Sequence, residues 1–228
     1  MTLITSLFPI LCYFAYGLGV PLLEKRRPSL SMIMNMQRRR WVANATMRES
    51  PFDAILSGNI MGSVSFLAST AVLLVLAVFT MFGQVSTLMA SLKTVSLDRV
   101  YTANEVQVHL LAMLAMFGLA FFAFTLSLRQ FNHFCIMLGA LDHGSHVPQE
   151  EIDAIAGINA LGAQNFNSGV RAYYFSVATV AWFAAEWLSI VVALATVLLL
   201  LHREFFSSAH RTAASAVVLA SRRTHKDA

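Results

Sequence analysis

The chain alternates between long apolar stretches and short polar connections. Four stretches are each about as long as the ~20 residues that a helix needs to cross ~30 Å of hydrocarbon. A helix on the surface of a soluble protein buries only one stripe, so runs that are apolar all round predict membrane spans. The sequence therefore predicts an all-α fold, an integral membrane bundle of about four transmembrane helices with further interfacial helices on the cytoplasmic side. The stretches cover roughly residues 3–23, 59–83, 106–128 and 172–201.

The composition supports this interpretation. Of 228 residues, 57% are hydrophobic and only 12% are charged, which is more apolar surface than a soluble domain of this size can bury. The connections are too short to fold separately. We therefore expect residues 1–205 to form one four-span membrane domain and residues 206–228 to form a basic, flexible tail. The two cysteines, Cys12 and Cys135, have no pattern of a disulfide framework or metal site.

The positions of Lys and Arg predict the orientation. Seven of these residues lie between residues 23 and 58, which makes the first connection the strongest cytoplasmic candidate. The first stretch lacks a small-residue cleavage site at its end, so we expect it to be retained as a span. Four spans then predict that both termini lie outside. The five Lys and Arg residues after residue 201 oppose this arrangement, and the conflict disappears if the fourth stretch does not cross completely.

The fourth stretch carries a stripe of polar residues at spacings of three and four. Glu186 falls near its middle, where a carboxylate costs about 2.5–3.5 kcal/mol on insertion scales. This residue must therefore be protonated, paired or hydrated. One interpretation is a relay for protons or cations, and the other is a neutral acid that binds a neighbouring helix through Ser65 or Ser69. The candidate relay consists of Glu186, Ser176, Thr179 and Ser189.

Small residues at helical spacing predict where helices approach one another closely. The second stretch carries Gly58, Gly62, Ser65 and Ser69, and the third carries Ala115 and Gly118. In the third stretch this face continues to Arg129, and we expect it to point into the bundle. Residues 165–169 contain asparagines and a glycine, which predicts a break before the last span.

Polar residues also gather at the predicted cytoplasmic ends of the spans. Cations at this depth need acids, phosphates or lipid headgroups as partners. Either a network that locks helix ends together or a ligand site would satisfy them. We expect Arg129 and Arg171 to lie close together, with Asp53 as their simplest partner. The members of this cytoplasmic cluster are Arg48, Asp53, Asn59, Arg129, Asn132, His133, Asn165, Asn167, Arg171 and Tyr173.

No motif for an enzyme, a cofactor or a metal is found. His109 and His202 are weak metal candidates, and His109 lies off the predicted inward face of its span. The loop at residues 142–146 is an equally weak candidate. We expect no catalytic residues, no cofactor, no bound metal and no nucleic-acid partner. The expected partners are the lipid bilayer, including anionic lipid near a basic surface helix at residues 28–47, and other copies of the chain or a larger membrane complex.

Four short runs together resemble a known family. They are Arg40-Trp41 to Met47-Arg48, Gly62-Ser63 to Ser69-Thr70, Arg129-Gln130-Phe131-Asn132-His133, and Gly169-Val170-Arg171-Ala172-Tyr173-Tyr174-Phe175. As a set they are similar to the membrane family catalogued as domain of unknown function 599, found in bacteria and plants. The resemblance extends over about residues 3–205 and implies a polytopic helical fold with no assigned activity. Glu186 lies outside these runs.

These patterns leave two functional classes open. A non-enzymatic transport or channel role is favoured by the polar stripe with Glu186. An accessory or scaffold subunit, within a homo-oligomer or a larger complex, is favoured by the small-residue faces. In either case we expect a multi-pass protein of the cell membrane, which in bacteria is the inner membrane.

Overall fold

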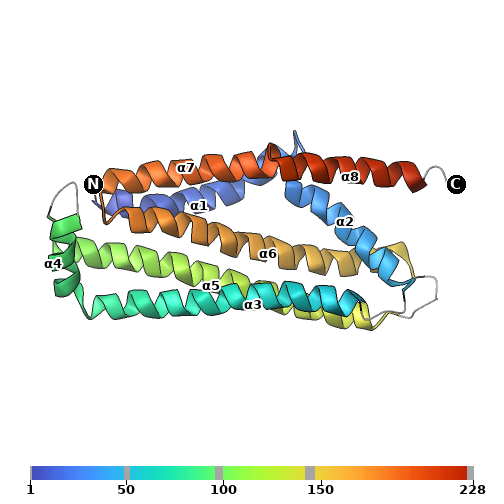
Figure 1. Ribbon diagram of the computed structural model, residues 1–228, viewed down its shortest axis with the longest axis horizontal. Coiled ribbons are helices and arrows are strands. Elements are labelled where there is room, and N and C mark those ends of the chain that lie inside the picture. Colours follow the sequence, from blue (N-terminus) through green and yellow to red (C-terminus); the bar gives the residue numbers. More distant parts are fainter. Residues whose placement is uncertain (1, 49–51, 96–99, 142–146, 225–228) are drawn as a thin grey trace. The chain divides into compact units, whose positions relative to one another are not determined.

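The computed structural model describes residues 2–48, 52–95, 100–141 and 147–224, and most of these residues are helical. No strand occurs among these residues, so the predicted all-α fold is confirmed (Figure 1). The helices are α1 (Thr2–Glu24), α2 (Leu30–Ala45), α3 (Phe52–Phe82), α4 (Val85–Val95), α5 (Ala103–Gly139), α6 (Gln149–Ala181), α7 (Glu186–Phe205) and α8 (Ser208–Thr224).

Four helical stretches are long and apolar enough to cross a membrane, as the sequence predicts. They are Leu3–Glu24, Phe52–Phe82, Ala103–Gly139 and Glu186–Leu219. With 31 and 37 residues, α3 and α5 are longer than the ~20 residues that a span requires. These two helices therefore continue beyond the hydrocarbon of a typical bilayer.

The helices form two compact units, each assembled from separate segments of the chain. The segments are residues 1–20, 65–125 and 166–198 for unit 1, and residues 21–64, 126–165 and 199–228 for unit 2. The units differ sharply in charge. Of the 16 Lys and Arg residues, all but Lys93, Arg99 and Arg171 belong to unit 2. Unit 1 is therefore the part of the molecule suited to hydrocarbon.

Unit 1 is built around the antiparallel pair of α5 and α6. Phe117 contacts Tyr173, with ring centroids 6.5 Å apart, and Phe124, later on α5, lies against Gly169, which comes earlier on α6. A Cβ atom on Gly169 would lie only 2.6 Å from the Phe124 ring. The absence of a side chain at Gly169 therefore allows the two helices to approach closely.

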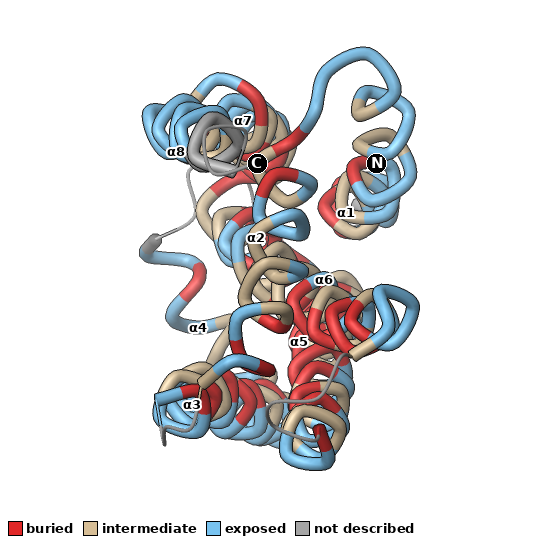
Figure 2. Tube along the Cα trace, turned by 90° about the vertical axis from the view of Figure 1, so that its right-hand side faces the viewer, coloured by how far each residue is buried: buried red, intermediate tan, exposed pale blue. Residues whose placement is uncertain are grey.

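The rest of the unit 1 core lies between α5, α4 and the end of α3. Figure 2 shows buried residues, in red, concentrated on α5. The core residues are apolar and mostly large. They are Val78, Leu92, Tyr101, Val106, Leu110, Met113, Phe117 and Trp182.

The buried face of α5 is not the one that its small residues predict. Ala115 is exposed, a Cβ on Gly118 would meet nothing within 4 Å, and Phe122 is 64% exposed. The prediction that this face points into the bundle is wrong. Lipid accepts apolar side chains as readily as a protein core does, so apolar character cannot distinguish the two faces of a span. The buried face instead carries His109, Met116 and their neighbours, which lie off the predicted inward stripe.

The predicted break before the last span is also wrong in position. Residues 165–169 lie within α6, which continues without interruption to Ala181. The chain turns at residues 182–185 instead, and Glu186 begins α7. The predicted single span over residues 172–201 therefore consists of two helical segments, which run in opposite directions within unit 1 (Figure 1).

In unit 2, α8 packs along α2. His210 Nε2 lies 2.9 Å from the Pro28 carbonyl oxygen, and the Ser31 backbone N–H donates to the Glu204 carboxylate at 2.9 Å. These contacts hold the start of α2 against the end of the chain. The segment expected to be a flexible tail thus contains a helix, Ser208–Thr224.

The close approach at Gly169 gives a first prediction. We expect Gly169→Ala to lower the free energy of unfolding by about 1–3 kcal/mol, because the added methyl group forces Phe124 out of its position. Thermal unfolding of the purified protein in detergent measures the change. Gly157→Ala is the matched control, since Gly157 lies on the same helix with nothing within 4 Å of its Cβ position. Equal stability of the two variants would contradict the close packing of α5 on α6.

Candidate functional site

His109 is the centre of a buried polar site in unit 1. It lies on α5, and its side chain is fully buried. Its Nε2 lies 2.7 Å from the Thr179 carbonyl oxygen, and its Nδ1 lies 2.9 Å from the Ser6 hydroxyl. Because a carbonyl only accepts, Nε2 carries a hydrogen, and Nδ1 of the neutral ring accepts from Ser6. Both ring nitrogens are therefore satisfied.

Trp182, at the turn between α6 and α7, packs flat against this imidazole. The two rings lie 4.0 Å apart with an interplanar angle of 11°, and Tyr101 stacks with the indole at 4.6 Å. The Tyr101 hydroxyl donates to the Trp182 carbonyl at 3.4 Å, while the indole N–H donates to the Thr5 hydroxyl at 3.1 Å. These bonds satisfy backbone and side-chain groups that the end of α6 would otherwise leave unpaired.

Glu186 is the first residue of α7, whereas the sequence predicted a position near the middle of a span. The Thr5 hydroxyl donates to its carboxylate at 3.4 Å. A helix N-terminus has a partial positive charge, which favours a carboxylate in the first turn. Consecutive residues of α1 thus connect to the two titratable groups, Thr5 to Glu186 and Ser6 to His109.

These contacts begin a longer line of polar contacts between α1 and α6, which we call the polar seam. Further along α1, the Tyr13 hydroxyl lies 2.6 Å from the Ser168 hydroxyl. One turn later, the Arg171 guanidinium lies over the Tyr16 ring, 5.5 Å from its centroid. The opposite side of α1 exposes leucines. The seam comprises Thr5, Ser6, Tyr13 and Tyr16 of α1 with Ser168, Arg171 and Thr179 of α6 and Trp182 of the turn.

The predicted relay residues lie in this region, but they do not form a single helical stripe. The Ser176 and Thr179 hydroxyls donate to carbonyls of their own helix, at 2.8 Å and 2.7 Å. Ser189 is fully buried on α7, and its hydroxyl has no hydrogen-bond partner among the described residues. The turn at residues 182–185 separates Ser176 and Thr179 from Glu186 and Ser189.

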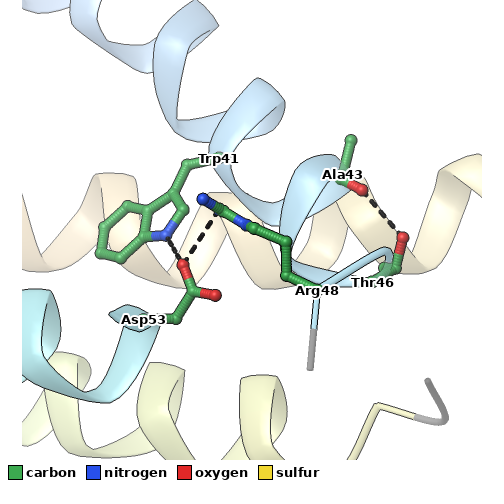
Figure 3. Close-up of polar contacts among 5 residues, drawn as sticks. All are labelled: Trp41, Ala43, Thr46, Arg48 and Asp53. Carbon is green, nitrogen blue, oxygen red and sulfur yellow. Dashed lines mark hydrogen bonds and ion pairs between the residues drawn. The ribbon is translucent and has the colours of Figure 1, made fainter. Parts of the chain in front are cut away.

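In unit 2, the carboxylate of Asp53, in the first turn of α3, contacts two residues, Trp41 of α2 and Arg48 just after α2 (Figure 3). The Arg48 guanidinium lies 3.1 Å from the Asp53 carboxylate, and the Trp41 indole N–H donates to the same oxygen at 2.6 Å. The prediction that Asp53 pairs with Arg129 and Arg171 is therefore wrong. Asp53 instead ties the basic connection after α2 to the first turn of α3.

The rest of the predicted cytoplasmic cluster is divided between the two units. In unit 2, Arg129, Asn132, His133 and Asn59 are exposed, and Asn165 donates to the Gln130 side chain at 2.6 Å. In unit 1, Arg171 Nε donates to the Asn167 carbonyl at 3.2 Å, and the Tyr173 hydroxyl donates to the Leu67 carbonyl at 2.7 Å. The convergence of Arg129 with Arg171 remains a prediction.

The small-residue stripe of α3 lies on the surface of the described chain. Gly58, Gly62, Ser65 and Ser69 are all exposed, and a Cβ on either glycine would meet nothing within 4 Å. These residues therefore do not pack against the described helices of their own chain. Their role in helix association remains a prediction.

The weak metal candidates gain no support. No group of three or more His, Cys, Asp and Glu side chains suited to a metal occurs in the described ranges. His109 uses both ring nitrogens within the protein, and His202 stacks on Phe206. The loop at residues 142–146 lies outside the described residues.

Comparison with known proteins identifies the family. The sequence profile of the family described as "Protein of unknown function, DUF599" matches residues 4–209. The chain belongs to the DUF599 family. The resemblance found in the sequence is thus confirmed, and the family description assigns no activity. No curated protein and no solved structure matches the chain.

Most of the residues around His109 were not predicted from the sequence. Thr5, Ser6, Tyr13 and Tyr16 are polar or amphipathic residues within an apolar stretch, and their spacing places them toward one side of α1. This spacing is a signal in the sequence, but it is weak because the first stretch is otherwise apolar and has the length of a membrane span. Trp182 and Tyr101 carried no comparable signal.

Asp53 gives a second prediction. We expect Asp53→Ala to lower the free energy of unfolding by about 1–3 kcal/mol, because a half-buried guanidinium and an indole N–H lose their acceptor. Asp153→Ala is the control, since its partner Arg39 lies 3.2 Å away with a side chain that is 61% exposed. An exposed pair of this kind contributes only about 0–1 kcal/mol. Chemical unfolding in detergent measures the free energy of unfolding of both variants. An equal decrease in Asp53→Ala and Asp153→Ala would refute a special role for Asp53.

Proposed function

We propose that this chain is a non-enzymatic membrane protein that conducts protons along the polar seam of unit 1. The observation that carries the proposal is the seam together with the two titratable groups that contact it, the His109 imidazole of α5 and the Glu186 carboxylate of α7. Ionisable groups within membrane segments are costly, and they commonly mark ion pathways. The proposal involves no catalytic residue, cofactor or nucleic acid.

In this proposal Glu186 and His109 are the groups that hold the proton. The hydroxyls of Thr5 and Ser6 each donate and accept, so each is able to pass a hydrogen bond onward. Thr5 contacts the carboxylate and Ser6 contacts the imidazole, with distances of 3.4 Å and 2.9 Å. Tyr13 and Ser168 continue the line toward the far end of unit 1.

The charge distribution supports an orientation for the seam. The starts of α1, α5 and α7 meet at the end of unit 1 that contains Glu186. The chain segments that follow residues 20, 125 and 198, where α1, α5 and α7 leave unit 1, carry all the Lys and Arg residues except Lys93, Arg99 and Arg171. By the positive-inside rule, we place the Glu186 end outside the cell and the basic connections in the cytoplasm.

This orientation changes the topology predicted from the sequence. Segments of α1, α3, α5, α6 and α7 each belong to unit 1. In addition to the four stretches that are long and apolar enough to span a membrane, we propose that α6 crosses within unit 1. A chain with five crossings ends on the cytoplasmic side. The basic residues after residue 201 then lie on the same side as the basic first connection. We therefore propose an N-terminus outside and a C-terminus inside, in the cell membrane, which in bacteria is the inner membrane.

Single cysteines test this topology in a background without Cys12 and Cys135. A membrane-impermeant thiol reagent should label Ser91→Cys on intact cells, whereas Met36→Cys and Ser215→Cys should react only after permeabilisation. All three positions are exposed on the described chain. Labelling of Ser215→Cys on intact cells would restore the C-terminus-outside arrangement.

Proton conduction is tested with purified protein in liposomes that enclose a pH-sensitive dye. An imposed membrane potential should acidify the lumen faster than in empty liposomes, and Glu186→Gln should reduce this flux at least tenfold, because glutamine cannot release a proton. Glu150→Gln is the matched control, since Glu150 is exposed at the start of α6 in unit 2. Wild-type flux equal to that of empty liposomes, or full flux in Glu186→Gln, would refute the proposal.

The exposed small-residue stripe of α3 favours a second candidate, a scaffold subunit that associates through this helix. Small side chains let helix backbones approach closely in a membrane. This candidate would gain support if the wild-type protein conducted no protons but formed a defined oligomer in mild detergent, and if Gly62→Leu converted that oligomer to a monomer.

A further inference from the structure

Arg38 is a cation of unit 2 for which the described chain provides no counter-charge. It lies on α2 in the run Arg38-Arg39-Arg40 and is only half-buried. Its Nε donates to the Asn159 side-chain oxygen at 2.8 Å, and its Nη1 donates to the Asn35 side-chain oxygen at 3.0 Å. Both acceptors are neutral amides.

Two nearby arginines have acidic partners. Arg39 pairs with Asp153 at 3.2 Å and Arg48 pairs with Asp53 at 3.1 Å, whereas no carboxylate of the described residues lies within 4.0 Å of Arg38 or Arg40. Arg38 differs from Arg40 in its bond to the buried Asn159. Burial lowers the pKa of Arg38 below its usual value. A guanidinium nevertheless stays charged in proteins, so its charge requires compensation from elsewhere.

Asn159 adds a second donor at the same place. It lies on α6 and is only 2% exposed. Because its side-chain oxygen accepts from Arg38, its Nδ2 must be a donor, and this atom has no partner in the described part of the chain. Buried amide hydrogens are rarely left unpaired in native proteins. One hydrogen bond thus joins the guanidinium to the oxygen of the Asn159 amide, while the Nδ2 of the same amide is a buried donor without a partner among the described residues.

A ligand that offers only acceptors and carries negative charge matches these groups. The outer nitrogens of a guanidinium bind phosphate oxygens in a two-pronged geometry, which Lys does not reproduce. Met34 lies one turn before Arg38 on α2 and is 41% exposed. An exposed apolar side chain beside an uncompensated cation is the arrangement that an anionic lipid fits, with its headgroup on Arg38 and an acyl chain against Met34.

We propose that Arg38, positioned by Asn159, binds the phosphate group of an anionic phospholipid. Arg38 makes the direct contact. Asn159 fixes the inner edge of the guanidinium, leaving the outer edge available to the lipid. This site is separate from the seam of unit 1 and does not depend on proton conduction.

The test measures binding to the purified full-length chain in detergent, with phosphatidylglycerol, phosphatidylcholine and inorganic phosphate as probes at matched ionic strength. Phosphatidylglycerol should raise the melting temperature and phosphatidylcholine should not. Arg38→Gln should weaken phosphatidylglycerol binding about tenfold or more, the effect expected for the loss of a charge-assisted bond. Arg40→Gln removes the same charge from a neighbouring position of α2 and should leave the affinity within about twofold.

Asn159→Asp is a second variant, which separates an effect on lipid binding from an effect on protein stability. The new carboxylate gives Arg38 an internal counter-charge, so the protein should be at least as stable as the wild type while phosphatidylglycerol binding is lost. A purely structural Arg38 would show the same stability without any change in lipid binding.

The remaining outcomes are equally informative. Inorganic phosphate that binds as well as phosphatidylglycerol would overturn the lipid assignment and identify a soluble phosphate as the ligand. No response to either probe, or equal binding by wild type and Asn159→Asp, would overturn the site.

Discussion

The turn that contains Trp182 determines how the rest of unit 1 is arranged. Its indole is held by Thr5 from α1, by Tyr101 before α5 and by the face of His109 on α5. No proline or glycine occurs at residues 182–185, so tertiary contacts rather than local propensity end α6 at this point. Because the chain reverses here, Glu186 lies at a helix N-terminus and α7 runs back through the unit. A turn two or three residues later would change both features.

The two units handle charge in different ways. Unit 2 contains most of the cations and pairs some of them with carboxylates, as Arg48 does with Asp53 and Arg39 with Asp153. In unit 1 the partners of the polar groups are mostly neutral: the His109 imidazole bonds a hydroxyl and a carbonyl, the Arg171 guanidinium lies over the Tyr16 ring, and the Glu186 carboxylate accepts from the Thr5 hydroxyl. Each unit thus follows the energetics of a different solvent, and this difference supports an assignment of unit 1 to the hydrocarbon.

The sequence predicted the helical class, the membrane-spanning stretches and the family, because all three depend on long runs of residues and on motifs. Prediction from the sequence failed where a single contact between side chains determines the local structure. Gly169 looked like a helix breaker, but it lies against Phe124 within an unbroken helix. The small residues of α5 predict a different inner face, and His109 lies off that face although it is fully buried. In a soluble protein, hydrophobicity would identify the buried face, whereas a membrane span is apolar on both faces. Asp53 was recognised as a partner for a cation, but the cation is Arg48, only five positions away.

The stacking of Trp182 on His109 also has an optical consequence. The rings lie 4.0 Å apart and nearly parallel, close enough for electron transfer from an excited indole to a protonated imidazole. Such transfer quenches indole emission. The chain contains three tryptophans, and among the described residues only Trp182 lies against a histidine ring. The protein therefore contains an intrinsic fluorophore beside its buried histidine, and a change in the protonation of that ring can be followed by light without attaching a label.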